Sequence, residues 1–239
     1  MRTWLLRIGL ALLALIIIGL LIEGALLLRL HNDVSTFAKY WQQKNAEVKA
    51  SDSLVYVAFG DSTAQGIGAS SPENGYVSLV AKKFATKTGK PVKIINLSVS
   101  GAKTDDVLSK QLPAYRKLAM KPDLVTVEIG ANDIKNFNAA QFQKSFEELA
   151  QQLPKGTYVS DIPWFGGRAR GSSKAAQQAS VIIREIVSKY GLTQVDLERA
   201  THAHNGLKMY SADYFHPSTY GYTVWAEAFW QKIQHFKYT

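Results

Sequence analysis

LVYVAFGDS, at residues 54–62, is the segment from which the architecture of this chain follows. Its first six residues are aliphatic or aromatic and end at a glycine, a pattern typical of a short buried strand. The polar Gly60-Asp61-Ser62 comes directly after that strand. In an open α/β sheet, this position beyond the carboxyl end of a strand is where ligands bind.

The same alternation of apolar runs and amphipathic stretches continues to the end of the chain. Four further strands are predicted at residues 92–97, 124–129, 157–162 and 192–196, and helices at 75–87, 105–118, 139–153, 175–190 and 218–236. Strands separated by helices imply right-handed crossovers and a parallel sheet with helices on both faces. We therefore expect a three-layer α/β/α sandwich with a parallel, flavodoxin-like sheet of about five strands.

The N-terminal segment has a different composition. Residues 8–28 read IGLALLALIIIGLLIEGALLL, with Glu23 as their single charge. A helix of this length spans about 30 Å, the thickness of the hydrocarbon core of a bilayer. A cleaved signal peptide is the alternative, although its small-x-small cleavage site is matched poorly by Ile22-Glu23-Gly24. The expected organisation is an anchor at residues 1–29, a polar stalk at 30–52 and one α/β domain at 53–239.

The flanks of the apolar segment bear on its orientation. Arg2 and Arg7 form a compact basic N-terminus, which favours an N-in topology with the α/β domain outside the cytoplasm. If the segment were cleaved instead, the domain would be secreted.

Composition excludes several classes of protein. The chain has 239 residues, a net charge of +9 and no cysteine, which removes disulfide scaffolds, zinc fingers and thiol nucleophiles. No basic helix face accompanies the positive charge, so no nucleic-acid partner is expected. No phosphate-binding loop follows residue 60, and we expect no cofactor and a monomer.

Polar motifs follow the first three predicted strands, and a fourth motif precedes the last predicted helix. Asn96-Leu-Ser-Val-Ser-Gly101 follows the second strand, and Gly130-Ala-Asn132-Asp133 follows the third. Asp213-Tyr-Phe-His216 stands before the last helix. Together with Gly60-Asp61-Ser62, these motifs predict one site at that edge.

These four motifs, in this order, resemble those of the SGNH hydrolases, also called the GDSL esterase/lipase family. The resemblance extends over about residues 54–236 and matches Ser62, Gly101, Asn132 and His216, with Asp213 as the acid. It implies that the N–H groups of Ser62 and Gly101 and the amide of Asn132 form an oxyanion hole. Thr63-Ala64 replaces the Leu-Ser of the family's first motif.

The chemistry of these residues agrees with that resemblance. A serine hydroxyl is a weak nucleophile until a base removes its proton, and His216 is the natural base. Asp213, three residues earlier, can orient the imidazole within one loop. Asp61 and Asp133 are expected to be structural hydrogen-bonding partners. The absence of a G-x-S-x-G motif around Ser62 argues against an α/β-hydrolase fold.

Two other groups of residues are weaker candidates. His202-x-His204 has the spacing of a metal-binding pair but no supporting carboxylate, so we expect a surface loop and no metal site. Arg168 and Arg170 lie in a loop at residues 164–174 that could bind an anionic substrate group, although such a loop is more often solvated.

The function expected from the sequence is a serine esterase. It would hydrolyse a carboxylic ester, of a lipid or an O-acylated carbohydrate, through an acyl-enzyme. An O-acyltransferase that uses the same site is one alternative. A catalytically silent binding module held at the membrane is another.

Overall fold

The central sheet is parallel and has the strand order expected for a flavodoxin-like fold. The computed structural model of the chain describes residues 2–165 and 173–235. Its strands are β1 (Leu54–Gly60), β2 (Val92–Asn96), β3 (Leu124–Glu128), β4 (Tyr158–Ser160) and β5 (Thr193–Val195), in the order β2-β1-β3-β4-β5. All neighbouring strands pair in parallel, so the predicted fold class is confirmed.

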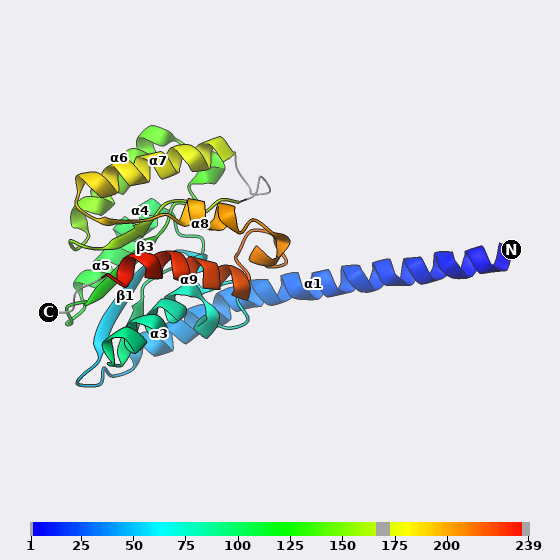
Figure 1. Cartoon of the computed structure of the whole chain (residues 1–239), viewed down its shortest axis with the longest axis horizontal. Coiled ribbons are helices and arrows are strands. Elements are labelled where there is room, and N and C mark those ends of the chain that lie inside the picture. Colours follow the sequence, from blue (N-terminus) through cyan, green and yellow to red (C-terminus); the bar gives the residue numbers. More distant parts are fainter. Residues whose placement is uncertain (1, 166–172, 236–239) are drawn as a thin grey trace.

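Helices cover both faces of this sheet (Figure 1). The described helices after the N-terminal one are α2 (Ser62–Gln65), α3 (Tyr76–Thr88), α4 (Thr104–Asp106), α5 (Leu112–Arg116), α6 (Ala139–Gln152), α7 (Ser173–Lys189), α8 (Leu197–Ala203) and α9 (Thr219–Ile233). Helices α4 to α7 pack on one face, and α3 and α9 pack on the other.

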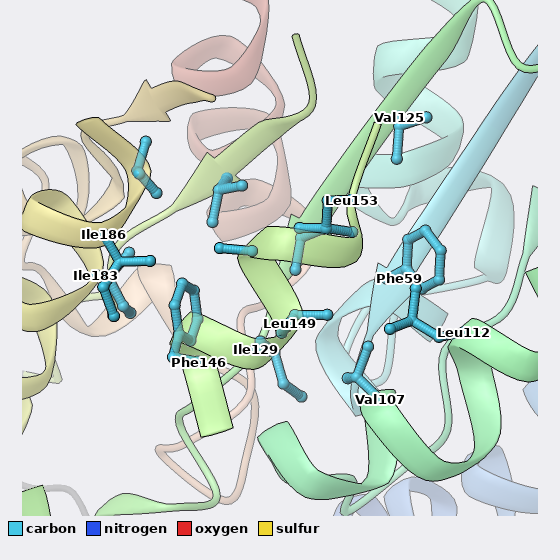
Figure 2. Packing of buried hydrophobic residues seen from close by; sticks show 14 of the residues in the cluster. Phe59, Val107, Leu112, Val125, Ile129, Phe146, Leu149, Leu153, Ile183 and Ile186 are labelled. Carbon is cyan, nitrogen blue, oxygen red and sulfur yellow. The ribbon is translucent and has the colours of Figure 1, made fainter. Parts of the chain in front are cut away.

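Strand β1 supplies both hydrophobic cores because successive side chains of a strand point to opposite faces. Val57 and Phe59 pack with the residues of α5, α6 and α7, as Figure 2 shows around Phe59 and Leu112. Tyr56 and Ala58 pack with α3 and α9 on the other side. This double burial explains why residues 54–59 contain no charged residue.

The helix predicted at residues 105–118 is interrupted. A π-helical turn, Val107–Gln111, joins α4 to α5, and Pro113 lies in the first turn of α5. Proline has no N–H to donate to the residue four positions earlier, so a regular α-helix cannot continue through it unchanged. The turn directs Gln111 into the buried interior.

The N-terminal helix is longer than expected. Helix α1 (Arg2–Ala46) runs without a break through most of the expected stalk, and Phe37 and Trp41 are buried against the α/β domain. These residues are four apart and therefore share one helix face. Residues 30–46 thus differ from the expected polar stalk, because Phe37 and Trp41 are buried where this part of the helix docks on the domain.

The N-terminal half of α1 projects away from the α/β domain (Figure 1). Its most apolar stretch has a mean hydropathy of 2.8, and none of that stretch is buried. By length and composition it is a candidate membrane span, the one such helix among the described residues.

Candidate active site

Three side chains from two distant parts of the chain form a hydrogen-bonded line. Ser62 begins α2 directly after β1, and its Oγ lies 2.8 Å from Nε2 of His216. Nδ1 of His216 lies 2.5 Å from Oδ2 of Asp213. An ionised carboxylate only accepts hydrogen bonds, so Nδ1 carries the ring proton and Nε2 faces the serine as an acceptor. This arrangement suits removal of the proton from Ser62.

The loop around Asp213 is built to keep its carboxylate charged. Oδ1 accepts the N–H groups of Phe215 and His216, each at 3.0 Å. Burial acts to raise the pKa of Asp213, but the hydrogen bond and charge of His216 and these two N–H groups hold the pKa below its usual value. Tyr214 within the loop has a φ of 52°, the only positive value outside glycine among the described residues. Such a backbone is uncommon and is often found at functional sites.

Gly68 allows the histidine loop to approach the serine. Its φ is +98°, and a Cβ at this position would lie 2.3 Å from the carbonyl oxygen of Pro217 and 3.0 Å from Cβ of His216. Any side chain would therefore push the loop away from Ser62 or strain the backbone.

The amide of Asn132 is held between the neighbours of the two other residues expected in the oxyanion hole, Ser62 and Gly101. Its Nδ2 donates to Oδ2 of Asp61 at 2.9 Å and to the carbonyl oxygen of Ala102 at 3.0 Å. Because both amide hydrogens already have acceptors, binding an oxyanion requires one of these bonds to be exchanged, and the bond to Ala102 is the weaker of the two. Gly101, beside Ala102, has a φ of +78° and no atom within 4 Å of a Cβ position, so its backbone is open to a ligand.

Asp61 belongs to a buried chain of hydrogen bonds that the sequence did not reveal in full. Its Oδ1 accepts from the backbone N–H and the hydroxyl of Thr63, both at 2.9 Å. The same hydroxyl contacts Oε2 of Glu128, the last residue of β3. Burial raises the pKa of both carboxyl groups, and for Glu128 it is raised well above the usual value, with the charge of Asp61 contributing. Asp61 also accepts N–H donors on both of its oxygens, from Thr63 and Asn132. Asp61 is therefore the carboxylate that is stabilised as an anion, and Glu128 is the partner that holds the proton.

The proton on Glu128 determines which group donates and which accepts in each of these hydrogen bonds. A protonated Glu128 donates to Thr63, whose single hydroxyl proton is then free for Asp61. Asp61 in turn accepts from Asn132. A buried carboxyl group thus supports the amide expected to bind the oxyanion, and the other oxygen of Glu128 has no partner among the described residues. The sequence signal for this role is that Glu128 is a single charged residue near the end of an otherwise uncharged predicted strand.

Two glutamines position the loops that carry the site. Gln111, on the π-helical turn, accepts from the N–H of Gly60 at 3.0 Å and donates to its carbonyl oxygen at 2.7 Å. Gln65 donates to the carbonyl oxygen of Ser98 at 2.9 Å and accepts from the hydroxyl of Ser100 at 2.6 Å. Sequence reasoning missed both residues, because their contacts are made across the fold.

An aromatic wall adjoins the histidine. The rings of Phe165 and Phe215 stack with their centroids 5.3 Å apart, and the ring of Phe215 meets that of His216 edge-on at 5.1 Å. Both phenylalanines are half-buried. An apolar surface beside the base is suited to contact the acyl or alcohol part of an ester.

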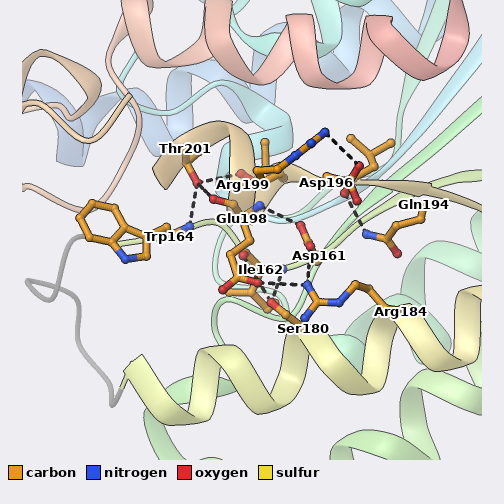
Figure 3. Close-up of polar contacts among 12 residues, drawn as sticks. Asp161, Ile162, Trp164, Ser180, Arg184, Gln194, Asp196, Glu198, Arg199 and Thr201 are labelled. Carbon is orange, nitrogen blue, oxygen red and sulfur yellow. Dashed lines mark hydrogen bonds and ion pairs between the residues drawn. The ribbon is translucent and has the colours of Figure 1, made fainter. Parts of the chain in front are cut away.

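An ion-pair cluster at the end of β4 fixes the segment that leads to Phe165 (Figure 3). Arg184 of α7 lies 2.9 Å from Oδ2 of Asp161 and 3.0 Å from Glu198 of α8. The N–H of Glu198 donates to Asp161 at 2.8 Å, and that of Trp164 donates to Thr201 at 2.8 Å. Strand β4, α7 and α8 are thereby joined next to the aromatic wall.

The weaker candidates have ordinary structural contacts. Asp133 accepts from the N–H of Thr104 at 3.2 Å, and burial raises the pKa of Asp133 to about 6. The ring of His202 packs on Trp164, and Nδ1 of His204 lies 2.9 Å from the carbonyl oxygen of Ala200. Within residues 2–165 and 173–235, no group of three or more His, Asp or Glu side chains is placed to hold a metal ion. Arg168 and Arg170 lie outside the described residues.

Comparison with known families gives a match that covers most of the α/β domain. The model of the GDSL-like Lipase/Acylhydrolase family matches residues 58–224. A GDSL-like esterase of Mycobacterium tuberculosis, Rv1075c, is 38% identical over 80 residues, which are 34% of this chain and 25% of that protein. The uncharacterised protein YpmR of Bacillus subtilis is 32% identical over 117 residues, 48% of this chain and 45% of that one. The aligned region thus spans less than half the length of either relative.

Solved structures share the fold. Axe2, an acetylxylan esterase from Geobacillus stearothermophilus, superposes with a TM-score of 0.62 at 21% identity, covering 80% of this chain and 98% of that chain. TesA superposes with a TM-score of 0.63 at 22% identity, covering 75% and 98%. In both cases the similarity extends over nearly the whole of the solved chain.

Proposed function

Because the chain belongs to the GDSL-like lipase/acylhydrolase family, we propose that it is a serine esterase that works through an acyl-enzyme on Ser62. The observation that carries this proposal is the line from Ser62 through His216 to Asp213, with distances of 2.8 and 2.5 Å. This geometry pairs a nucleophile with a base and the base with a group that orients it.

The first half of the reaction forms the acyl-enzyme. His216 takes the hydroxyl proton of Ser62 at Nε2 while the serine oxygen bonds to the ester carbonyl carbon. The carbon–oxygen bond to the alcohol then breaks, and the imidazolium gives its proton to the departing oxygen. Asp213, already charged, stabilises the imidazolium between these two transfers.

The second half releases the acid. Water gives a proton to His216 and adds to the acyl carbon, and collapse of this intermediate returns the proton to Ser62. In both halves the negative oxygen is stabilised by the N–H groups of Ser62 and Gly101 and the amide of Asn132. The two N–H groups are held in place by the backbone before the reaction, and the amide of Asn132 joins them by exchanging its bond to Ala102.

The proposal includes a membrane anchor. Residues 8–28 would cross the bilayer, with the catalytic domain on the extracytoplasmic side. The exposed, apolar N-terminal half of α1 supports this assignment. The anchor predicts that the full chain stays in the membrane pellet after an alkaline carbonate wash. Release into the supernatant would contradict it.

Hydrolysis of a short p-nitrophenyl ester by the full chain tests the esterase directly. Ser62→Ala should abolish turnover while the circular dichroism spectrum stays unchanged. Ser109→Ala is the matched control, because that hydroxyl is exposed and bonds only to the carbonyl oxygen of Asp105. Undiminished turnover by Ser62→Ala would overturn the proposal.

A further inference from the structure

Helix α1 is joined to the domain at the edge of the sheet that carries the site. Near its end, Asn45 donates to the carbonyl oxygen of Asn96, the last residue of β2, and accepts from its N–H, at 2.8 and 2.9 Å. One turn earlier, Trp41 donates to the carbonyl oxygen of Gln65 at 2.9 Å, in the helix that begins at Ser62. Followed towards its N-terminus, α1 therefore passes the carboxyl ends of the strands.

The next contact lies at the rim of the site. Arg29 donates to the carbonyl oxygens of Ser70 at 3.0 Å and Ala69 at 3.4 Å. This loop includes Gly68, which lies against His216 and Pro217. Arg29 is also the first residue after the apolar segment 8–28. With that segment in the hydrocarbon core, the loop that packs on the catalytic histidine lies at the level of the lipid headgroups.

The orientation of α1 gives the same result. It is one continuous helix, and its N-terminal half leaves the domain on the side where α9 begins (Figure 1). The start of α9 immediately follows the histidine loop. The carboxyl edge of the sheet, with Ser62 and His216, therefore faces the end of α1 that would enter the bilayer.

Exposed apolar side chains gather on this edge. Among the described residues outside α1, four of the six exposed large hydrophobic side chains lie there: Val99 (43% exposed), Leu207 (60%), Tyr214 (47%) and Tyr220 (37%). Lys103 is exposed near Val99, and Nζ of Lys208 lies 4.2 Å from the ring centroid of Tyr220. We name these six residues the docking edge.

We infer that the docking edge rests on the anionic bilayer that holds residues 8–28, so that the site opens onto the membrane surface. Tyrosine and lysine together are suited to the interface, where aromatic rings lie among headgroups and cations attract anionic lipids. The bilayer is the expected partner of this surface because α1 runs from this edge directly into the segment that would enter the membrane. The inference rests on the proposed anchor. With the docking edge on the bilayer, the aromatic wall of Phe165 and Phe215 would contact esters carried by the membrane.

The absence of cysteine permits a direct test in the full chain reconstituted in vesicles of phosphatidylglycerol and phosphatidylcholine. Leu207→Cys carries an environment-sensitive fluorophore on the docking edge. Val48→Cys is the matched control, since Val48 is 94% exposed and precedes Lys49, which lies beside Leu54 and Asp123 at the amino ends of the strands. Lipids with a quencher below the headgroup should quench the label at 207 and leave the label at 48 bright. Equal quenching of the two labels would overturn the inference, whatever the enzymatic activity.

A spacer in α1 tests the consequence for the site. Seven helical residues inserted between Leu28 and Arg29 raise the domain by about 10 Å and nearly preserve its rotation. The same insertion before Trp4 is the control. The spacer should lower hydrolysis of a fluorogenic lipid ester in the same bilayer at least tenfold, with hydrolysis of p-nitrophenyl acetate unchanged. Unchanged lipid hydrolysis would overturn the inference, and loss of both activities in the parent protein would instead contradict the esterase itself.

Discussion

At the level of single residues, the site depends on polar side chains that take no part in bond making. Asn132 joins Asp61 to the loop of Ala102 and supplies the amide proposed for the oxyanion. Removing one such donor typically lowers the rate by about 10²–10³. Removing the amide of Asn132 is therefore a sensitive test of how the negative oxygen is stabilised.

Asn132→Ala should lower kcat for a p-nitrophenyl ester by about 10²–10³ and change KM little, because the donor acts mainly in the transition state. Asn138→Ala is the control, since that residue only caps α6 by accepting from the N–H of Gln141. An unchanged kcat for Asn132→Ala would show that this amide does not stabilise the oxyanion.

Glu128 gives a prediction on stability. Its folded-state pKa lies well above the unfolded value, so the folded protein binds this proton more tightly. The stabilisation from this group is complete below the unfolded pKa of about 4.3 and is lost as the pH rises towards the folded pKa. Glu128→Gln cannot ionise and avoids this loss.

The stability of Glu128→Gln relative to the parent should therefore increase with pH, by up to about 1.4 kcal/mol per unit. Urea unfolding of both proteins at pH 5 and pH 8, in the same detergent, measures it. If the difference in free energy of unfolding is the same at both values, Glu128 is not protonated in the folded state.

At the level of elements, the ion-pair cluster joins β4, α7 and α8. Asp161 is only 2% exposed, and burial raises its pKa to about 6 despite Arg184. Arg184→Gln should lower the free energy of unfolding by about 1–3 kcal/mol, because the carboxylate stays buried without its charged partner. Lys189→Gln breaks a more exposed pair with Glu147 and should lower the free energy of unfolding less than Arg184→Gln does. Equal losses in urea unfolding would show that the cluster has no special role.

The elements also show which features the sequence could predict. The strands and most helices followed from periodicity because each buries one face or both. The π-helical turn at Val107–Gln111 was missed, since Pro113 alone does not indicate how the preceding turn adapts. Helix α8 was missed because its seven residues are too few to show a periodic pattern. The docking of Trp41 depends on a partner surface more than twenty residues later in the chain.

The candidate site was easier to predict than its supports. Ser62, Asp213 and His216 were expected together because each follows a strand or precedes a helix at one edge, and the structure brings them into hydrogen-bonding distance. Gln111 and Glu128 act through contacts across the fold, and a single sequence carries no record of such contacts.

At the level of the whole molecule, helix α1 links an apolar segment to the rim of the site. Arg29 holds the loop beside His216, so the position of the apolar segment and the position of the candidate site are coupled. The α/β domain, for which we propose the esterase activity, therefore has a defined orientation to the apolar segment that precedes it. The proposed activity depends on Ser62 being the nucleophile.

Labelling with a fluorophosphonate, followed by mass spectrometry of the peptides, tests that point most directly. We expect one adduct on Ser62 in the full chain, and labelling of His216→Ala slower by about 10²–10⁴ because the base is missing. Ester hydrolysis by a protein whose adduct lies on another serine, or that carries none, would contradict the assignment of Ser62.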